Sequence, residues 1–222
     1  MSQSRGLILD SIFFKVPELS ILEGAYMKVK PGNITALIGR NGSGKSTLLK
    51  VAAGQIKPSS GISIIDGVRI HNKSVRNRFQ SIAYLPQKSM LPRDLSVRRI
   101  LKSVVLSAKY LRDPIIEKIL DQKVLELSGG EQRYLEIAII FSLNRNYFLM
   151  DEPFTGVEPL IIDLIIERIK EQARRGKGIL ITDHLYRYIT EIANEAYLMH
   201  NKQCYPVNGD ISTELKKLGY LK

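Results

Sequence analysis

Several features that would point to other classes of protein are missing from this sequence. Cys204 is the only cysteine among the 222 residues, so the chain has neither an internal disulfide nor a metal site built from several cysteines. The longest apolar runs, 135–143 and 160–166, contain acidic residues and fall short of the roughly 18 to 20 residues that a membrane span needs. Asp10 interrupts the apolar start, and no small-residue cleavage site follows it. We therefore expect a cytoplasmic chain that does not itself cross a bilayer.

The composition favours one compact unit. Hydrophobic residues make up 44% of the chain and charged residues 25%, which is ordinary globular usage, and 222 residues are enough to bury one substantial core. No repeat, low-complexity tract or linker divides the sequence. We predict a single domain over residues 1–222.

Short apolar runs alternate with longer amphipathic stretches along the chain. Strands are predicted at 7–9, 12–16, 25–29, 33–38, 62–65, 82–85, 147–150 and 179–182, the last four being short runs typical of buried parallel strands. Helices are predicted at 47–53, 96–110, 114–123, 130–143, 159–174 and 185–193. This alternation predicts an α/β fold, a sheet with helices on its faces. Because no strand separates the helices of 96–123, we expect an inserted helical subdomain at approximately 88–142.

The net charge of +11 is concentrated in one part of the sequence. Between Asp66 and Arg112 there are eleven Lys and Arg residues but only two acids, Asp66 and Asp94. Such an excess suits a nucleic acid, an anionic membrane surface or an acidic partner, and a merely solvated basic face is the alternative. If a membrane-embedded partner lies opposite this stretch, the arginines expected to face it are Arg69, Arg76, Arg78, Arg93, Arg98 and Arg99.

A glycine-rich segment joins the predicted strand 33–38 to the predicted helix 47–53. Residues 39–46 read GRNGSGKS, which fits the phosphate-binding loop in its strand-to-helix context. Glycines let backbone N–H groups surround an anion, and the helix start adds a favourable dipole. We expect Lys45 to reach the β- and γ-phosphates and Ser46 to bind Mg²⁺. The predicted nucleotide-binding residues of this loop are Gly39, Asn41, Gly42, Ser43, Gly44, Lys45, Ser46 and Thr47.

Two carboxylates follow the apolar run 147–150. Asp151 and Glu152 stand at the carboxyl end of a predicted buried strand, the edge at which open α/β sheets bind ligands. We expect Asp151 to hold Mg²⁺, directly or through water, and Glu152 to accept a proton from water that attacks the γ-phosphate. Solvated acids are common after strands, but together with a phosphate loop the catalytic interpretation is favoured.

A second candidate anion site opens the predicted helix 130–143. In the segment LSGGEQ, residues Ser128, Gly129 and Gly130 offer a hydroxyl and exposed N–H groups at a helix start, which suits a terminal phosphate. Taken alone, the segment is equally consistent with a helix cap in which Ser128 and Glu131 form a capping box.

These motifs together resemble the ABC ATPases, of which LSGGEQ is the signature, standing 23 positions before Asp151 as in that family. The resemblance covers nearly the whole chain. It implies a P-loop NTPase (RecA-like) fold with an N-terminal antiparallel β subdomain, and ATP hydrolysis with Mg²⁺. Gln87 looks like the Q-loop glutamine, which contacts Mg²⁺ and couples the site to the transport partner. His184 looks like the switch histidine at the γ-phosphate, although a lone histidine after a strand is more often structural. The implied catalytic residues are Lys45, Gln87, Glu152 and His184, and the implied metal-site residues are Ser46, Gln87 and Asp151.

The resemblance also implies partners. The family pairs two cassettes head to tail, so that Ser128, Gly129 and Gly130 of one subunit contact the γ-phosphate held by the other. We expect a second ATP-binding subunit, preferably a second copy of this chain, and separate transmembrane permease subunits. The chain itself is expected to lie in the cytoplasm, bound peripherally to the cytoplasmic face of the cell membrane. Two positions depart from the family pattern. Glu158 stands where its D-loop usually carries Asp, and Val16 where an aromatic residue stacks on adenine, so selectivity for ATP over GTP is expected to be loose.

Among the branches of this family, the sequence resembles the lipopolysaccharide-export ATPases at 84–87, 95–97, 151–157, 181–184 and 196–198, and branched-chain amino-acid importers share part of the pattern. Only 41 positions separate Gln87 from Ser128, which predicts a trimmed helical subdomain. The alternative function is a soluble ABC ATPase acting on nucleic acid or ribosomes. The long coiled coils, zinc modules or second cassette of such proteins are missing, so nucleic acid is not the expected partner. A cassette that binds ATP without hydrolysing it is opposed by the intact Lys45, Asp151, Glu152 and His184.

Overall fold

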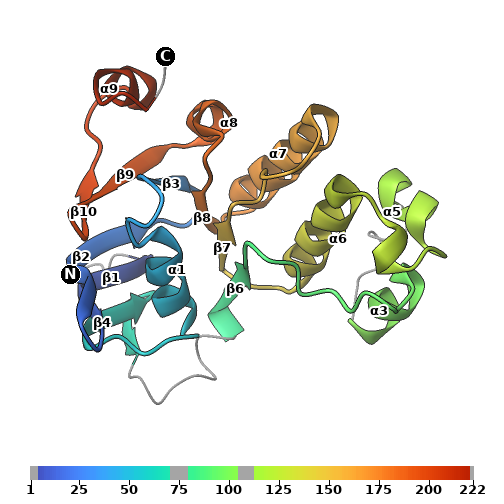
Figure 1. The fold of residues 1–222 in the computed structure, drawn as a ribbon, viewed down its shortest axis with the longest axis horizontal. Coiled ribbons are helices and arrows are strands. Elements are labelled where there is room, and N and C mark those ends of the chain that lie inside the picture. Colours follow the sequence, from blue (N-terminus) through green and yellow to red (C-terminus); the bar gives the residue numbers. More distant parts are fainter. Residues whose placement is uncertain (1–4, 71–79, 105–112, 221–222) are drawn as a thin grey trace.

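The computed structural model describes residues 5–70, 80–104 and 113–220, whose strands form two sheets (Figure 1). The antiparallel sheet has the order β2-β1-β4-β5, with β1 at Leu7–Val16, β2 at Leu19–Val29, β4 at Ser60–Ile65 and β5 at Val68–Ile70. The other sheet has the order β10-β9-β3-β8-β7-β6, formed by β3 (Ile34–Ile38), β6 (Ile82–Leu85), β7 (Tyr147–Asp151), β8 (Gly178–Thr182), β9 (Glu195–His200) and β10 (Gln203–Pro206). Its strands are parallel except β10, which pairs antiparallel with β9.

Helices cover this mainly parallel sheet. Those of the described residues are α1 (Lys45–Ala53), α3 (Val97–Ser103), α5 (Pro114–Ile119), α6 (Gly129–Ser142), α7 (Pro159–Arg174), α8 (Tyr186–Ile192) and α9 (Ile211–Lys217), with a 3-10 turn at Val124–Glu126. Figure 1 shows α3 and α5 at the end of the molecule remote from the antiparallel sheet, next to α6. None of the helices in the described ranges is long and apolar enough to span a bilayer.

The core has two layers because the central strands are buried on both faces. All five residues of β8 are buried, and alternate side chains point to opposite sides of a sheet. Ile179 and Ile181 join the hydrophobic cluster that includes residues of α6, α7 and α8, whereas Leu180 joins the one that includes α1 and the antiparallel sheet. Helix α1, which follows the phosphate loop, is therefore held between the two sheets.

The predicted α/β fold class is confirmed, and the predicted strands coincide with observed strands or parts of them to within one residue. One expectation about the strands is wrong. The run 62–65 was predicted to be a buried parallel strand, but it belongs to β4, which pairs antiparallel with β1 in the other sheet. An apolar run does not encode the direction of the neighbouring strand, and within this run Ser63 and Ile65 are buried while Ile62 and Ile64 are half-buried.

Two predicted helices are shorter in the structure. Helix α3 ends at Ser103, followed by an extended Val104, and residues 105–110 of the predicted helix 96–110 lie outside the described residues. Helix α5 ends at Ile119 rather than at Lys123, because the chain turns there so that Lys123 can form a β-bridge with Ser96. Strands β5, β9 and β10 and helix α9 were not predicted.

Candidate active site

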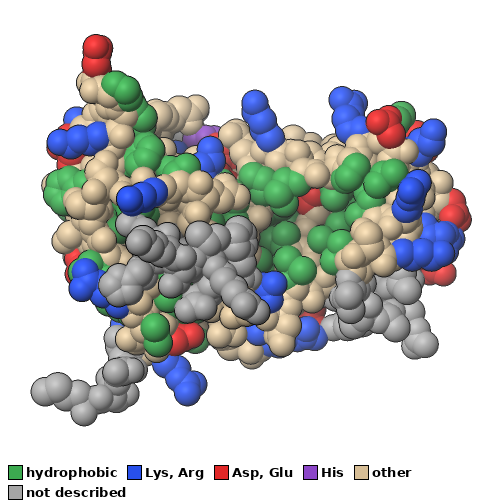
Figure 2. Space-filling model, turned by 90° about the horizontal axis from the view of Figure 1, so that it is seen from below, with side chains coloured by type: hydrophobic (Ala, Val, Ile, Leu, Met, Phe, Trp, Pro, Cys, Tyr) green, Lys and Arg blue, Asp and Glu red, His purple; other side chains and the backbone are tan. Residues whose placement is uncertain are grey.

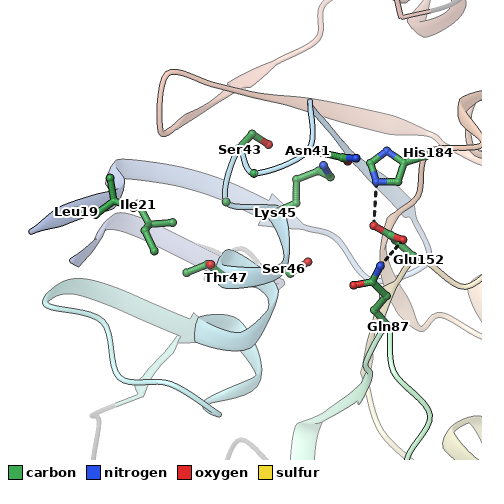
Figure 3. Close-up of a pocket in the computed structure, with 12 residues that line it drawn as sticks. Leu19, Ile21, Asn41, Ser43, Lys45, Ser46, Thr47, Gln87, Glu152 and His184 are labelled. Carbon is green, nitrogen blue, oxygen red and sulfur yellow. Dashed lines mark hydrogen bonds and ion pairs between the residues drawn. The ribbon is translucent and has the colours of Figure 1, made fainter. Parts of the chain in front are cut away.

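A pocket of about 470 Å³ opens at the carboxyl ends of β3, β6, β7 and β8 (Figure 3). Because these strands are parallel, their carboxyl ends share one edge of the sheet, where open α/β sheets bind ligands. The pocket is lined by Leu19, Ile21, Asn41, Gly42, Ser43, Gly44, Lys45, Ser46, Thr47, Gln87, Glu152 and His184. Most of the residues predicted to bind nucleotide or to act in catalysis thus lie around one pocket.

The loop before α1 has the shape of an anion cradle. Gly44 has a φ of 106°, a left-handed conformation, and a β-carbon there would lie 3.2 Å from the carbonyl oxygen of Ile21. Gly39 packs so closely that a β-carbon would lie 2.7 Å from the carbonyl oxygen of Met199. No side chain caps the start of α1, and the buried Ser43 hydroxyl has no hydrogen-bond partner. An anion in this loop would satisfy these donors, so the residues present fit a phosphate group.

Lys45 lies folded over the same loop. Its Nζ donates to the carbonyl oxygens of Gly39, at 2.7 Å, and Arg40, at 3.0 Å, and the residue is buried. Burial lowers the pKa of Lys45, although the nearby Glu152 and Asp151 oppose this effect. The side chain therefore brings a desolvated cation to the pocket, where it would interact strongly with a phosphate.

Asp151 connects the end of β7 to α1 and β6. Its Oδ1 accepts a hydrogen bond from the Ser46 hydroxyl at 3.0 Å, and its Oδ2 accepts one from the Tyr84 hydroxyl at 3.0 Å. Burial raises the pKa of Asp151, partly offset by these two hydrogen bonds. The structure thus brings together Ser46 and Asp151, both predicted metal-site residues, and it adds Tyr84, which the sequence did not single out.

The Glu152 carboxylate is contacted by side chains that follow the two neighbouring strands, β6 and β8. Its Oε2 accepts from Nε2 of Gln87 at 2.7 Å, and its Oε1 lies 2.9 Å from Nε2 of His184 (Figure 3). The Thr155 hydroxyl donates to the same Oε2 at 3.3 Å. Three predicted catalytic residues, Gln87, Glu152 and His184, are therefore in direct contact. Thr155 belongs to a segment that the sequence marked only as the D-loop.

The segment that carries His184 is fixed by its neighbours. Asp183 is fully buried and accepts from the backbone N–H groups of Phe154, at 2.8 Å, and Leu185, at 3.0 Å. Burial raises the pKa of Asp183 while these hydrogen bonds oppose the shift. The Tyr186 hydroxyl donates to the carbonyl oxygen of Gly39 at 3.1 Å, which ties this segment to the phosphate loop. A supporting role for Asp183 and Tyr186 was not predicted.

The predicted signature residues do not line this pocket. Ser128 Oγ accepts from the N–H of Glu131 at 3.2 Å, and Oε2 of Glu131 accepts from the N–H of Ser128 at 2.9 Å, so the capping box exists. A β-carbon on Gly130 would collide with the Glu158 carboxylate. The longer acid in the D-loop therefore lies directly against the start of α6.

Val16, predicted to contact adenine, is also outside the lining. It ends β1 and pairs with Leu19 across the hairpin. Leu19 and Ile21 of β2 contact the pocket instead, being alternate residues that share one face of the strand. The alternation of β2 is the sequence signal for this face, whereas the family's aromatic position falls on β1.

Part of the predicted basic stretch is already paired. The guanidinium of Arg98 donates to Asp121 at 2.7 and 2.9 Å. Arg69, Arg93 and Arg99 are exposed, while Arg76 and Arg78 lie outside the described residues. On the face shown in Figure 2, the Lys and Arg side chains of the described residues lie around a band of hydrophobic side chains.

Comparisons with known proteins point in one direction. A family model described as ABC transporter matches residues 22–155. The chain is 34% identical over 193 residues to the lipopolysaccharide export system ATP-binding protein LptB of Haemophilus influenzae, covering 81% of this chain and 80% of that protein. It is 35% identical over 196 residues to LptB of Escherichia coli (strain K12), with coverages of 81% and 80%. A solved structure of an ATP-binding subunit of an ABC transporter superposes with a TM-score of 0.82 at 27% identity, covering 97% of this chain and 94% of that one.

Proposed function

The chain belongs to the family of ABC transporter ATP-binding subunits, which are ATPases that drive transport, and on that premise we propose that its ATP is hydrolysed in the pocket described above. The observation that carries the proposal is the Glu152 carboxylate, which faces the phosphate loop between Gln87 and His184. A carboxylate at this place is suited to take a proton from water that attacks a bound γ-phosphate.

The other pocket residues have roles that follow from their positions. Lys45 and the N–H groups of the loop bind the phosphates, and the Ser43 hydroxyl, which has no hydrogen-bond partner among the described residues, is a further donor in the same loop. His184 orients the attacking water together with Glu152. Leu19 and Ile21 contact the base or ribose through apolar surface alone.

Ser46, Asp151 and Gln87 are the residues proposed to hold Mg²⁺. No group of three or more His, Cys, Asp and Glu able to bind a metal ion occurs within residues 5–70, 80–104 and 113–220. A magnesium ion at Ser46 and Asp151 would therefore depend on phosphate oxygens for further ligands, as Mg²⁺ sites in nucleotide-binding proteins do. When bound, the ion neutralises charge on the transferred phosphoryl group.

The signature residues are proposed to act on a second subunit. Ser128, Gly129 and Gly130 begin α6 outside the pocket of their own chain, and a helix start is suited to a phosphate. In a head-to-tail dimer they would contact the γ-phosphate bound by the other chain. We also propose that residues 1–222 form a single ABC ATPase domain, into which a helical subdomain is inserted at approximately 88–142.

The relatives suggest the transported substrate and the place of action. Two of the similar proteins are named as lipopolysaccharide-export ATP-binding proteins, so we propose that this subunit drives export of a lipid of that class through separate membrane subunits, from the cytoplasmic face. A groove of about 390 Å³ near Gln87 supports docking of such a partner, being lined by Ser89, Leu91, Arg93, Val124, Leu125, Leu127 and Gln132.

The test is Glu152→Gln, which keeps the shape of the side chain but removes its basicity. We expect ATP turnover to fall by at least about a hundredfold while ATP binding persists, since general base catalysis contributes about 10²–10⁴-fold. Size-exclusion chromatography with ATP and Mg²⁺ should then show an ATP-bound dimer. Turnover at the unmodified rate would refute the assignment of Glu152 as the base.

A further inference from the structure

An arginine from the signature helix reaches the backbone beneath the candidate active site. Arg133, in the second turn of α6, is 6% exposed. Its Nη2 donates to the carbonyl oxygens of Asp151, at 2.7 Å, and Glu152, at 2.9 Å. Its Nη1 donates to the carbonyl oxygen of Pro86 at 2.8 Å. One guanidinium therefore bonds to three backbone carbonyls at the ends of β6 and β7.

The backbone at Glu152 requires such support. Its φ is 50°, a left-handed conformation that costs energy for a residue with a side chain and persists only where the surroundings hold it. The N–H of Glu152 continues the sheet by donating to the carbonyl oxygen of Thr182 at 2.7 Å. Arg133 donates hydrogen bonds to the backbone carbonyl oxygens of both Asp151 and Glu152. The arginine thus stabilises the turn that aims the Glu152 side chain into the pocket.

The same guanidinium also fixes the segment that carries Gln87. Pro86 directly precedes Gln87, whose side chain donates to Glu152 at 2.7 Å. Arg133 therefore holds the backbone on both sides of that contact. Glu136, one turn further along α6, accepts from Nη1 of Arg133 at 3.0 Å and from the N–H of Met90 at 3.1 Å. The loop from Pro86 to Met90 is bonded at both ends to this buried ion pair.

We propose that Arg133, oriented by Glu136, is a positioning residue for hydrolysis: it sets the geometry between Glu152 and Gln87 without touching the nucleotide. The proposal rests on the proposed role of Glu152 as the base. It also gives α6 two functions, because the helix that presents the signature motif supports the site of its own chain. Arginine suits this place better than lysine, because the two separate amino groups of its planar fork reach the carbonyls of β6 and β7 and the Glu136 carboxylate together, whereas an ammonium is a single point.

The first variant is Arg133→Lys, which keeps the charge that pairs with Glu136 but loses the fork. We expect kcat for ATP hydrolysis to fall by about tenfold to a hundredfold, because small misplacements of catalytic groups have effects of that size. The ATP dissociation constant, measured by calorimetry on the same protein, should stay within about twofold, since Arg133 does not line the pocket. A merely structural role would weaken binding and turnover together.

A double-mutant cycle with Glu152→Gln separates this idea from the assignment of the base. If Arg133 acts through Glu152, adding Arg133→Lys to Glu152→Gln should reduce the residual rate by less than about twofold, because residues that act as a unit are not additive. The matched control is Arg168→Lys on α7, another largely buried arginine, whose partners Tyr134 and Asp113 lie away from the pocket. Its kcat should remain unchanged.

The outcomes are distinguishable. An unchanged kcat in Arg133→Lys, a parallel loss of ATP binding, or an equal further loss on top of Glu152→Gln would each overturn the positioning role. A Glu152→Gln variant that hydrolyses ATP normally would overturn the proposed base, whatever Arg133 does. If Arg133→Lys does not fold, the paired variant Arg133→Met with Glu136→Met removes both charges and leaves neither one unpaired. Glu136→Gln offers a milder change that keeps an acceptor for Met90, and a normal kcat in both of these variants would count against the proposal.

Discussion

The imidazole Nε2 of His184 lies 2.9 Å from Oε1 of Glu152, although 32 positions separate the two residues in sequence. They follow the neighbouring parallel strands β8 and β7, whose pairing continues to Asp151 and Thr182. The contact is therefore a consequence of strand order, and it places an acid and an imidazole at the same edge of the pocket.

His184→Ala should slow ATP hydrolysis by about a hundredfold or more while leaving ATP binding largely intact, because the proposed role of the imidazole, orienting the attacking water, belongs to the hydrolytic step alone. Phosphate release over time measures the turnover, and calorimetry measures the binding. The control is Tyr186→Phe, which removes a hydroxyl bonded to Gly39 and leaves the Glu152–His184 contact in place. Equal turnover in His184→Ala and the unmodified chain would show that Glu152 works without it.

Asp151→Asn should stabilise the nucleotide-free chain and abolish the Mg²⁺ dependence of ATP binding. Burial raises the pKa of Asp151, so the folded chain binds this proton more tightly than the unfolded chain does. The contribution of Asp151 to stability therefore falls as the pH rises above the unfolded value of about 3.9, and at neutral pH the carboxylate is a cost.

Asp151→Asn removes that charge and should raise Tm, by about 2–4 °C for each kcal/mol gained in the free energy of unfolding. Thermal unfolding at pH 7 measures the shift. At acidic pH, where Asp151 is protonated in both states, the difference should shrink. A lower Tm of Asp151→Asn at pH 7 would mean that the hydrogen bonds from Ser46 and Tyr84 outweigh the cost of burial.

ATP and GTP should bind within about tenfold of each other, since one stacking contact is worth about 1 kcal/mol and the pocket offers Leu19 and Ile21 instead of an aromatic ring. Calorimetry with both nucleotides gives the ratio. Leu19→Ser should weaken both by a similar factor because the lost contact is apolar. A preference of a hundredfold for ATP would require a polar group that reads the base.

Arg99→Gln should reduce binding to acidic liposomes more than Arg98→Gln does. Both residues are exposed, but the charge of Arg98 is already paired with Asp121. An exposed basic residue at an anionic bilayer contributes about 1 kcal/mol, which a sedimentation assay at moderate salt resolves. Strongly salt-dependent binding to nucleic acid, with no affinity for acidic liposomes, would favour the nucleic-acid alternative instead.

The sequence by itself determined the local parts of the site. Residues 39–46 form the predicted loop because the left-handed turn at Gly44 and the helix start at Lys45 depend on neighbours in the chain. Asp151 and Glu152 were placed correctly because an apolar run ends in front of them. Helix α7 has the predicted bounds, Pro159–Arg174, since proline suits the first helical position and the apolar spacing follows the helical period.

Tertiary structure alone decided which side chains meet. Tyr84 and Asp151, or Arg133 and Pro86, are joined by the strand order and by the packing of α6, and neither is encoded within one segment. Tertiary structure likewise decided that Leu19 rather than Val16 lines the pocket, and that residues 62–65 pair antiparallel with β1. Local sequence fixes backbone conformation and the period of burial, whereas the choice among possible neighbours depends on the packing of the whole chain, which is why these contacts emerged only from the fold.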